Sequence, residues 1–233
     1  MPVTWFLTGA SRGIGLEITR QLLESSSNTV FASCRSPATA FDLDALKSSP
    51  GTLHIIQIDV MDEISIKAGC SKVLELLNST GLDYVINNAA INHTRDLAFS
   101  FDPAALAETI KCNVTGPALV TRFLLPSIEK SSRKVIVNIS SLLASISRDF
   151  GPISTSYSIS KIGLNMLTYK QSRERPDFIP ILMDPGWVKT DMGGEGAEIE
   201  PRVSVTGILN VATKLMSADA GKFYTYLGEE NPW

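Results

Sequence analysis

The chain has 233 residues, of which 44% are hydrophobic and 19% charged, and its formal net charge is −3. It has no run of Lys and Arg, which argues against a nucleic-acid partner, and no apolar stretch of about 18 residues that would span a membrane. Its first residues show no basic region or small-residue cleavage site of a signal peptide. Three scattered cysteines and two histidines predict neither a disulfide framework nor a metal site. We therefore expect a mildly acidic cytoplasmic protein.

Short apolar runs alternate along the chain with segments of helical period. The predicted strands are Val3–Thr8, Thr29–Cys34, His54–Ile58, Tyr84–Asn87, Lys134–Ile139, Ile179–Met183 and Phe223–Tyr224. They are apolar throughout rather than alternating, which is typical of strands covered on both faces. The predicted helices are Ile14–Leu23, Ile64–Leu77, Leu106–Ile128, Ser156–Arg173 and Val203–Met216. Pro126 is expected to act as a stop signal within the long helix Leu106–Ile128.

This alternation predicts right-handed βαβ units and a single α/β domain over residues 1–233. We expect a doubly wound (Rossmann) parallel sheet of about seven strands with helices on both faces. In such sheets ligands bind beyond the carboxyl ends of the strands. The residues that follow each predicted strand are therefore the candidate functional residues.

A glycine-rich segment, T-G-A-S-R-G-I-G at residues 8–15, follows the first predicted strand and opens the first helix. Exposed N–H groups at a helix amino terminus bind pyrophosphate, and glycines let the backbone approach it closely. The segment predicts a dinucleotide site. A plain glycine turn is the alternative interpretation.

Arg35 follows the second predicted strand, with no acidic residue beside it. An acidic residue in this place binds a ribose 2′-hydroxyl, whereas an arginine accommodates a 2′-phosphate. Together with Arg12 of the glycine-rich segment, it predicts a preference for NADPH/NADP+. Two solvated surface arginines are the alternative.

Polar residues also follow the third and fourth predicted strands. Asp59, followed by Val60, would accept from the exocyclic amine of an adenine or cap the helix that starts near Asp62. Asn87 and Asn88 would shape a turn through side-chain bonds to the backbone.

Tyr157 and Lys161 are four residues apart, which places a phenol and an ammonium on one helix face. A phenol with a pKa near 10 is a poor acid–base catalyst at neutral pH until a cation stabilises its phenolate. Just upstream, Ser140 and Ser141 end the fifth predicted strand and offer hydroxyl donors at the same sheet edge. Serines in this place are also common turn residues.

Taken together, these residues resemble the short-chain dehydrogenase/reductase family over nearly the whole chain. The matching motifs are Thr8-Gly9-x3-Gly13-x-Gly15, Asn87-Asn88-Ala89, Asn113, Ser141, Tyr157-x3-Lys161 and Pro185-Gly186. Within the family, the segments Asp184–Gly194 and Gly228–Trp233 are similar to those of small sniffer-like carbonyl reductases. The sequence departs from the family at Ala90, where glycine is usual, and in a long gap between Ser141 and Tyr157.

The resemblance implies that Tyr157 is the general acid of a reduction and that Lys161 lowers its pKa and binds the nicotinamide ribose. Ser141 would orient the substrate carbonyl, and Asn113 would hold a water in a proton relay. The implied cofactor site comprises Gly9, Ser11, Arg12, Gly13, Ile14, Gly15, Arg35, Asp59, Val60, Asn87, Asn88, Ala89, Tyr157, Lys161, Pro185, Gly186, Val188 and Thr190, the last binding the nicotinamide carboxamide.

The leading hypothesis is an NADPH-dependent carbonyl reductase that acts on a ketone, aldehyde or quinone. A catalytically silent dinucleotide sensor on the same fold is the alternative, although it would need only the glycine-rich segment. A nucleotide-sugar epimerase shares Tyr and Lys but usually carries a second domain, for which 233 residues leave no room.

Two surfaces carry further expectations. The loops Ile91–Leu97, Leu142–Ser154 and Trp187–Ile199 would wall the substrate pocket. Their Phe150, Trp187 and Met192 favour an apolar or aromatic substrate. His93 lies in the first of these loops, where solvent exposure is the expected state. A second apolar stripe on the two long helices predicts a homodimer; it comprises Leu119, Phe123, Leu124, Met166, Leu167 and Tyr169.

Overall fold

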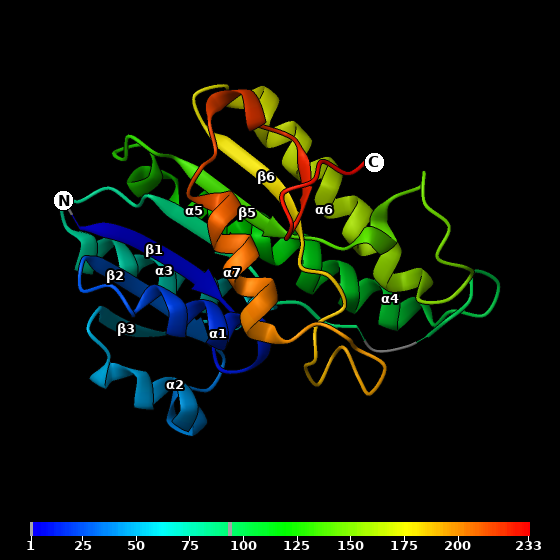
Figure 1. Cartoon of the computed structure of the whole chain (residues 1–233), viewed down its shortest axis with the longest axis horizontal. Helices are drawn as coiled ribbons and strands as arrows, with labels where there is room; N and C mark the ends of the chain where they lie inside the picture. The colour runs from blue at the N-terminus through cyan, green and yellow to red at the C-terminus, as the bar shows by residue number, and fades with distance from the viewer. Residues whose placement is uncertain (1, 93–94) are drawn as a thin grey trace.

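A parallel sheet runs through the middle of the molecule in the computed structural model, which describes residues 2–92 and 95–233 (Figure 1). Within these residues the sheet has seven strands in the order β3-β2-β1-β4-β5-β6-β7. The strands are β1 Val3–Thr8, β2 Asn28–Cys34, β3 Thr52–Gln57, β4 Tyr84–Asn87, β5 Val135–Ile139, β6 Ile179–Asp184 and β7 Phe223–Thr225. Every neighbouring pair is parallel. The predicted doubly wound sheet is confirmed.

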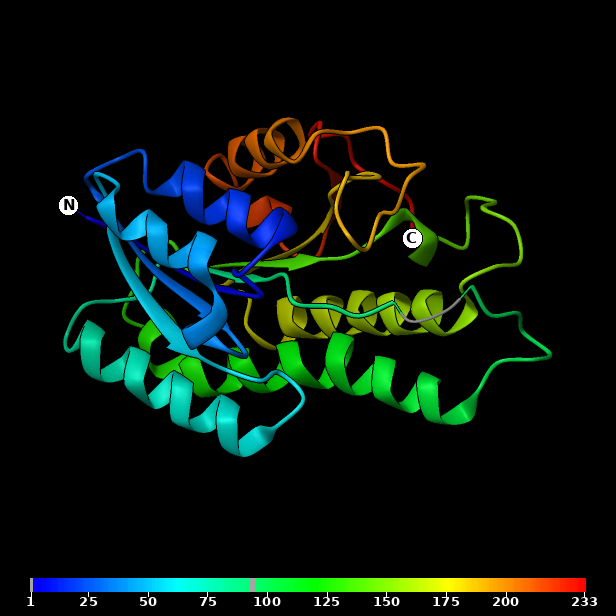
Figure 2. The same cartoon turned by 90° about the horizontal axis from the view of Figure 1, so that it is seen from below.

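Helices cover both faces of this sheet (Figure 2). They are α1 Gly13–Leu22, α2 Phe41–Ala45, α3 Glu63–Leu77, α4 Pro103–Ile110, α5 Gly116–Ile128, α6 Thr155–Glu174 and α7 Pro201–Ala212. Helices α1 and α7 lie on one face, and α3, α4, α5 and α6 lie on the other. Short 3₁₀ turns occur at Pro37–Thr39, Leu46–Ser48, Leu142–Ala144 and Ser217–Asp219.

The core consists of two main apolar layers, one on each face of the sheet. Successive side chains of a strand point to opposite faces, so Trp5 and Leu7 of β1 pack in the layer under α1 and α7. Phe6, between them, packs in the layer under α3 and α5. This two-sided burial is why the central strands are apolar at every position.

The edge strand β3 departs from that pattern. It starts at Thr52, two residues before the predicted start, and both Thr52 and Gln57 are exposed. Backbone pairing with β2 continues through these polar positions, because ladder hydrogen bonds do not depend on an apolar side chain. Lys134 was predicted to begin the fifth strand, but β5 starts at Val135, because the φ of 52° at Lys134 is left-handed.

The predicted helix Leu106–Ile128 begins at Pro103 and contains a π-helical turn, Lys111–Thr115, between α4 and α5. Its start is set by Asp102, whose Oδ1 accepts from the Ala104 N–H at 2.9 Å. Pro126 does not stop the helix where it stands, since α5 continues to Ile128. A proline removes only the hydrogen bond to the residue four positions before it, and the helix ends within the next turn.

The remaining helix bounds are close to the predictions except at the end of α7, which stops at Ala212 rather than Met216. The strand order reverses direction between β1 and β4, and ligands of open α/β sheets bind at such a switch point. The fold therefore brings the segments after β1, β4, β5 and β6 to one edge of the sheet.

Candidate active site

The turn between β1 and α1 accepts only glycine at two of its positions. Gly9 has a φ of 71° and Gly13 a φ of 56°, in the left-handed region. A Cβ added to Gly15 would lie 2.2 Å from the Gly9 carbonyl oxygen. The turn thus folds back on itself, with Ser11 within it and Ile14 in the first turn of α1. The N–H groups of that first helical turn point past the end of the sheet.

Residues after β4 hold this turn in place. Thr8 Oγ1 accepts from the N–H groups of Asn88 and Ala89, at 3.1 and 3.0 Å. Asn88 Nδ2 donates to the carbonyls of Thr8 and Gly9, at 3.0 and 3.2 Å. The predicted turn-shaping role of an asparagine is therefore seen at Asn88.

Asn87 lies in the core instead, below the sheet edge. Its Nδ2 donates to Asn138 Oδ1 at 2.8 Å and to Thr121 Oγ1 at 3.2 Å. Asn138 in turn donates to Thr168 Oγ1 of α6 at 2.8 Å. The two asparagines at the end of β4 thus have different roles. Asn88 shapes the turn, and Asn87 connects the sheet to α5 directly and to α6 through Asn138.

At the ends of β2 and β3, Arg35 is exposed while Cys34 is buried. Asp59 Oδ1 accepts from the Met61 N–H at 2.9 Å, so this carboxylate shapes its own turn. Helix α3 is capped by Asp62, whose Oδ1 accepts from the Ile64 N–H at 2.9 Å. The residue that caps α3 is therefore Asp62 and not Asp59.

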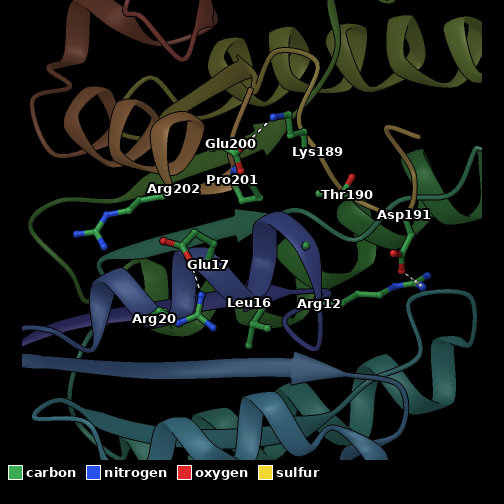
Figure 3. A pocket seen from close by; sticks show the side chains of 11 residues that line it. Arg12, Leu16, Glu17, Arg20, Lys189, Thr190, Asp191, Glu200, Pro201 and Arg202 are labelled. Atoms are coloured by element: carbon green, nitrogen blue, oxygen red, sulfur yellow. Dashed lines mark hydrogen bonds and ion pairs between the residues drawn. The ribbon is translucent and has the colours of Figure 1, made fainter. Parts of the chain in front are cut away.

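A cleft of about 410 Å³ lies between the start of α1, the segment Lys189–Asp191 and the start of α7 (Figure 3). Arg12 Nη1 reaches across its mouth to Asp191 Oδ2 at 2.8 Å, and both side chains are more than three-quarters exposed. Such an exposed ion pair contributes little to stability, so Arg12 can exchange it for another anion. Gly13 faces Thr190, whose methyl group would lie 3.2 Å from a Cβ added there.

Helix α6 carries Tyr157 and Lys161 to the carboxyl end of β5. Lys161 is buried, and its Nζ donates to the Ile139 carbonyl at 2.8 Å and lies 5.5 Å from the Tyr157 ring centroid. Among the described residues that is its one hydrogen bond, which leaves two ammonium N–H groups for a ligand. Burial lowers the pKa of Lys161 to about 8.

Burial raises the pKa of the Tyr157 hydroxyl above 10, the nearby carboxylate of Asp184 raises it further, and hydrogen bonding to Ser141 acts in the opposite direction. The resemblance implies that Lys161 lowers this pKa. In the structure burial and Asp184 outweigh any such effect, and the lowering stays a prediction for the enzyme with its cofactor.

The two serines after β5 differ in what they contact. Ser140 is buried and its Oγ donates to Asn165 Oδ1 at 2.6 Å. Ser141 is half-buried, accepts from the Leu143 N–H at 3.2 Å and lies beside Tyr157. The geometry favours Ser141 as the functional serine, as expected from the resemblance.

Asn113 lies in the π-helical turn and is fully buried. Its side chain pairs with both backbone groups of Ile91, accepting from the N–H and donating to the carbonyl, each at 2.9 Å. Its Nδ2 also donates to Ser160 Oγ at 3.0 Å. Both Nδ2–H groups are used and Oδ1 accepts one hydrogen bond, so the predicted water would bind at the backbone of this π-turn, where the regular helical ladder is interrupted.

Asp184, at the end of β6, is a buried carboxylate that joins two loops of the site. It accepts from the Leu142 N–H at 2.8 Å and from the Gly186 N–H at 2.9 Å. Gly186 has a φ of 76°, and a Cβ there would lie 2.5 Å from Ile199. In the same exit segment, Thr190 Oγ1 bonds to the Val188 carbonyl and the Gly193 N–H.

A sequence model of the family described as short chain dehydrogenase matches residues 4–200. The chain belongs to the short chain dehydrogenase family. It is an oxidoreductase of that family, 29% identical to an uncharacterised oxidoreductase of Schizosaccharomyces pombe over 98% of this chain and 97% of the relative. It is 30% identical to norsolorinic acid ketoreductase of Aspergillus parasiticus over 98% of this chain and 90% of the relative.

Two solved carbonyl reductases have the fold of this short chain dehydrogenase over their whole length. One is the NADPH-bound enzyme from chicken fatty liver, with 34% identity and a TM-score of 0.94 over 100% of both chains. The other is the carbonyl reductase Sniffer of D. melanogaster, with 27% identity and a TM-score of 0.95 over 100% of both chains. The expected likeness to sniffer-like carbonyl reductases is confirmed.

Thr8 and Asp184 lie in segments that the sequence singled out, but their roles in organising the site of this short chain dehydrogenase were not predicted. The partner of Thr8 at Asn88 lies 80 residues away, and that of Asp184 at Leu142 lies 42 residues away. His93 lies outside the described residues. Within residues 2–92 and 95–233, no helix is long and apolar enough to cross a membrane, and no cluster of three metal-ligating side chains is present.

Proposed function

We propose that this short chain dehydrogenase is an NADPH-dependent carbonyl reductase that reduces a ketone, aldehyde or quinone. The observation that carries the proposal is the gathering of Tyr157, Lys161 and Ser141 at the carboxyl edge of the sheet, next to the glycine turn. A dinucleotide sensor needs the turn but not a buried ammonium beside a phenol.

The residues present fit a dinucleotide. The three glycines of the turn have no side chain that would keep a pyrophosphate from the backbone, and Thr190 faces Gly13. Lys161 has two unused N–H donors, which suit the hydroxyls of a ribose. The solved chicken relative has NADPH bound, which supports NADP(H) as the cofactor of this chain.

When bound, the nicotinamide supplies a hydride to the carbonyl carbon. Tyr157 then donates its proton to the carbonyl oxygen, and Ser141 holds that oxygen by a hydrogen bond. Tyr157 is protonated at neutral pH, because burial raises its pKa. As the proton leaves, the ammonium of Lys161 would stabilise the phenolate that forms. Lys161 would hold the ribose of the cofactor, and a water at the Asn113 backbone would supply the proton that restores Tyr157.

The substrate that fits best is apolar or aromatic. Phe150, Trp187 and Met192 of the expected pocket walls are between 44% and 50% exposed, so their apolar surfaces are open to contact. Aromatic and apolar side chains that line a site with a few convergent polar groups are typical of small-molecule pockets.

A cytoplasmic location and a homodimer complete the proposal. Cys34, Cys70 and Cys112 are buried free thiols, as is usual for a protein of a reducing compartment. For the dimer, Met166 and Tyr169 of α6 are 54% and 37% exposed.

Leu124 is not part of the dimer surface that the sequence predicted. It is fully buried in the core, because it lies on the face of α5 that packs on the sheet. Leu119 and Phe123 also pack partly against that core. The exposed stripe is therefore narrower than expected and lies mainly on α6.

The experiment is an assay of purified protein with NADPH and a panel of ketones, aldehydes and quinones, followed by NADPH oxidation. Tyr157→Phe is the matched variant, because it keeps the ring and removes only the proton donor. General acid catalysis contributes roughly 10²–10⁴-fold, so turnover should fall by that factor while NADPH binding, measured by fluorescence, is retained. Binding of NADPH without turnover of any carbonyl by the wild type would instead indicate the sensor.

A further inference from the structure

Helix α6 begins without a cap of its own. Ser154, the residue before its first turn, has a left-handed φ of 62° and its side chain makes no capping bond. The first N–H groups of a helix have no partner within the helix and need acceptors from elsewhere. Tyr157 is the third residue of this helix, so whatever fixes the first turn also fixes the phenol.

Asp96, about 60 residues earlier in the chain, supplies those acceptors. Its carbonyl oxygen accepts from the Thr155 N–H at 3.2 Å. Both carboxylate oxygens lie 3.2 Å from the Ser156 nitrogen, and Ser156 Oγ donates to Oδ2. A carboxylate at this place also complements the positive end of the helix dipole. Asp96 therefore caps α6 from another segment.

The segment that carries Asp96 is held at a second point beside Tyr157. Ile91, at its start, is paired through both backbone groups with Asn113. Asn113 donates to Ser160 Oγ, and Ser160 Oγ donates to the Tyr157 carbonyl at 2.7 Å. Both attachments of the segment thus end on the first two turns of α6.

Beyond Asp96, the same loop exposes apolar side chains. Leu97 is 44% exposed and Phe99 fully exposed. The loop extends past the carboxyl ends of the strands, beside the loop that contains Phe150 (Figure 2). Apolar surface in this place is where an apolar substrate would first make contact.

We propose that Asp96 is a positioning residue that sets the orientation of Tyr157 by capping α6 from the substrate-side loop. The inference rests on the proposed carbonyl reductase activity and deepens it, because it assigns to Asp96 a role that acts through Tyr157.

The test compares Asp96→Ala with Asp96→Asn and with Asp102→Ala. Asparagine caps helices as well as aspartate does, so it is the conservative rescue. Asp102 caps α4 from the same loop by the same kind of bond, to the Ala104 N–H at 2.9 Å, and it is the matched control. Each alanine variant removes one helix cap, and both should lower the melting temperature by a similar few degrees.

The expected result is a kcat for Asp96→Ala that is lower by about tenfold or more, with the KM for NADPH within about twofold of the wild type, because the phenol is displaced and the cofactor site is not. Asp96→Asn should recover most of this kcat, and Asp102→Ala should keep it. The proposal is overturned if Asp96→Ala keeps wild-type kcat, if asparagine is as impaired as alanine, or if Asp102→Ala loses kcat equally.

A readout independent of activity separates this inference from the proposed function. Hydrogen exchange of the Ser156 amide, whose acceptor is the Asp96 carboxylate, should speed up in Asp96→Ala and not in Asp102→Ala. If the wild type reduces no carbonyl while this amide still loses protection in Asp96→Ala, the proposed function fails and the cap stands. Unchanged protection in Asp96→Ala would overturn the cap itself.

Discussion

The proposed preference for NADPH over NADH rests on Arg35. It is exposed at the end of β2, next to the buried Cys34, where an acidic side chain would repel a 2′-phosphate. A guanidinium binds phosphate oxygens by paired, charge-assisted hydrogen bonds worth roughly 1.5–3 kcal/mol each. Because the site is open to water, the lower end of that range applies.

Arg35→Ala should therefore raise the KM for NADPH by about tenfold or more and leave the kinetics with NADH nearly unchanged. Arg12→Ala is the comparison, and it should have a smaller effect because Arg12 must first leave Asp191. Equal use of the two cofactors by the wild type, or the same loss with both after Arg35→Ala, would contradict the assignment.

Lys161 links the chemistry of the site to the stability of the protein. Burial lowers its pKa from 10.5 to about 8, so at neutral pH the folded chain holds a buried ammonium that water would stabilise better. At about 1.4 kcal/mol per pKa unit, the shift from 10.5 to about 8 corresponds to a destabilisation of the folded chain by about 3 kcal/mol. This destabilisation is fully present below pH 8. It is relieved as pH rises from 8 to 10.5, because in this range the unfolded chain binds more protons than the folded chain.

Lys161→Met should accordingly abolish reduction yet raise the free energy of unfolding of the cofactor-free protein at pH 7. The gain over the wild type should shrink as pH rises toward 10. Urea unfolding at several pH values measures it, with Lys72→Met as the control, since that lysine is more than half exposed. A gain that is the same at pH 7 and pH 10 would show that charge burial is not its cause.

At the scale of elements, the turn between β1 and α1 depends on the absence of side chains. Gly15→Ala would place a Cβ 2.2 Å from the Gly9 carbonyl and 2.7 Å from Asn88 Nδ2, which breaks both the turn and its attachment to β4. NADPH binding, measured by fluorescence titration, should be lost. Tyr157→Phe should retain it, so the pair of variants separates the cofactor site from the proton donor.

Most elements were predictable from the sequence, whereas several attachments between them were not. The exception among the α-helices is α2 Phe41–Ala45, whose five residues are too few to show an apolar period. Strands such as β1 and β4 are apolar runs bounded by polar turns, and the helices between them have a clear apolar period, so local pattern alone placed both kinds. The glycine turn and the Tyr157–Lys161 pair were also predictable, because the residues that act together in each lie within a few positions of one another in the sequence.

The π-helical turn at Asn113 has no such local signal, since its sequence is compatible with a regular helix. The roles of Asp96 and Asp184 depend on partners about 60 and 42 residues away. An aspartate that ends a strand or lies in a loop looks the same whether it caps a distant helix or faces solvent. Such contacts arise only when the sheet edge assembles.

At the scale of the whole molecule, the exposed surface of α6 is the basis for the expected homodimer. Ile159 and Met166, at 39% and 54% exposure, lie seven residues apart and so on the same side of the helix. Light scattering at micromolar concentration should give a mass near twice the 25.2 kDa of one chain. Met166→Lys should shift that mass toward one chain, and a monomeric wild type would contradict the prediction.

The dispersal of the cofactor site along the chain has a consequence for folding kinetics. Thr8 and Gly9 are fastened by Asn88, and Gly13 faces Thr190, so no early segment contains a complete site. Long-range pairing of parallel strands is slow to form, and the site closes only when β6 and its exit segment have docked. Nicotinamide cofactors therefore cannot speed the early steps but stabilise the finished protein by mass action. The return of NADPH fluorescence enhancement during refolding would time the last step of assembly.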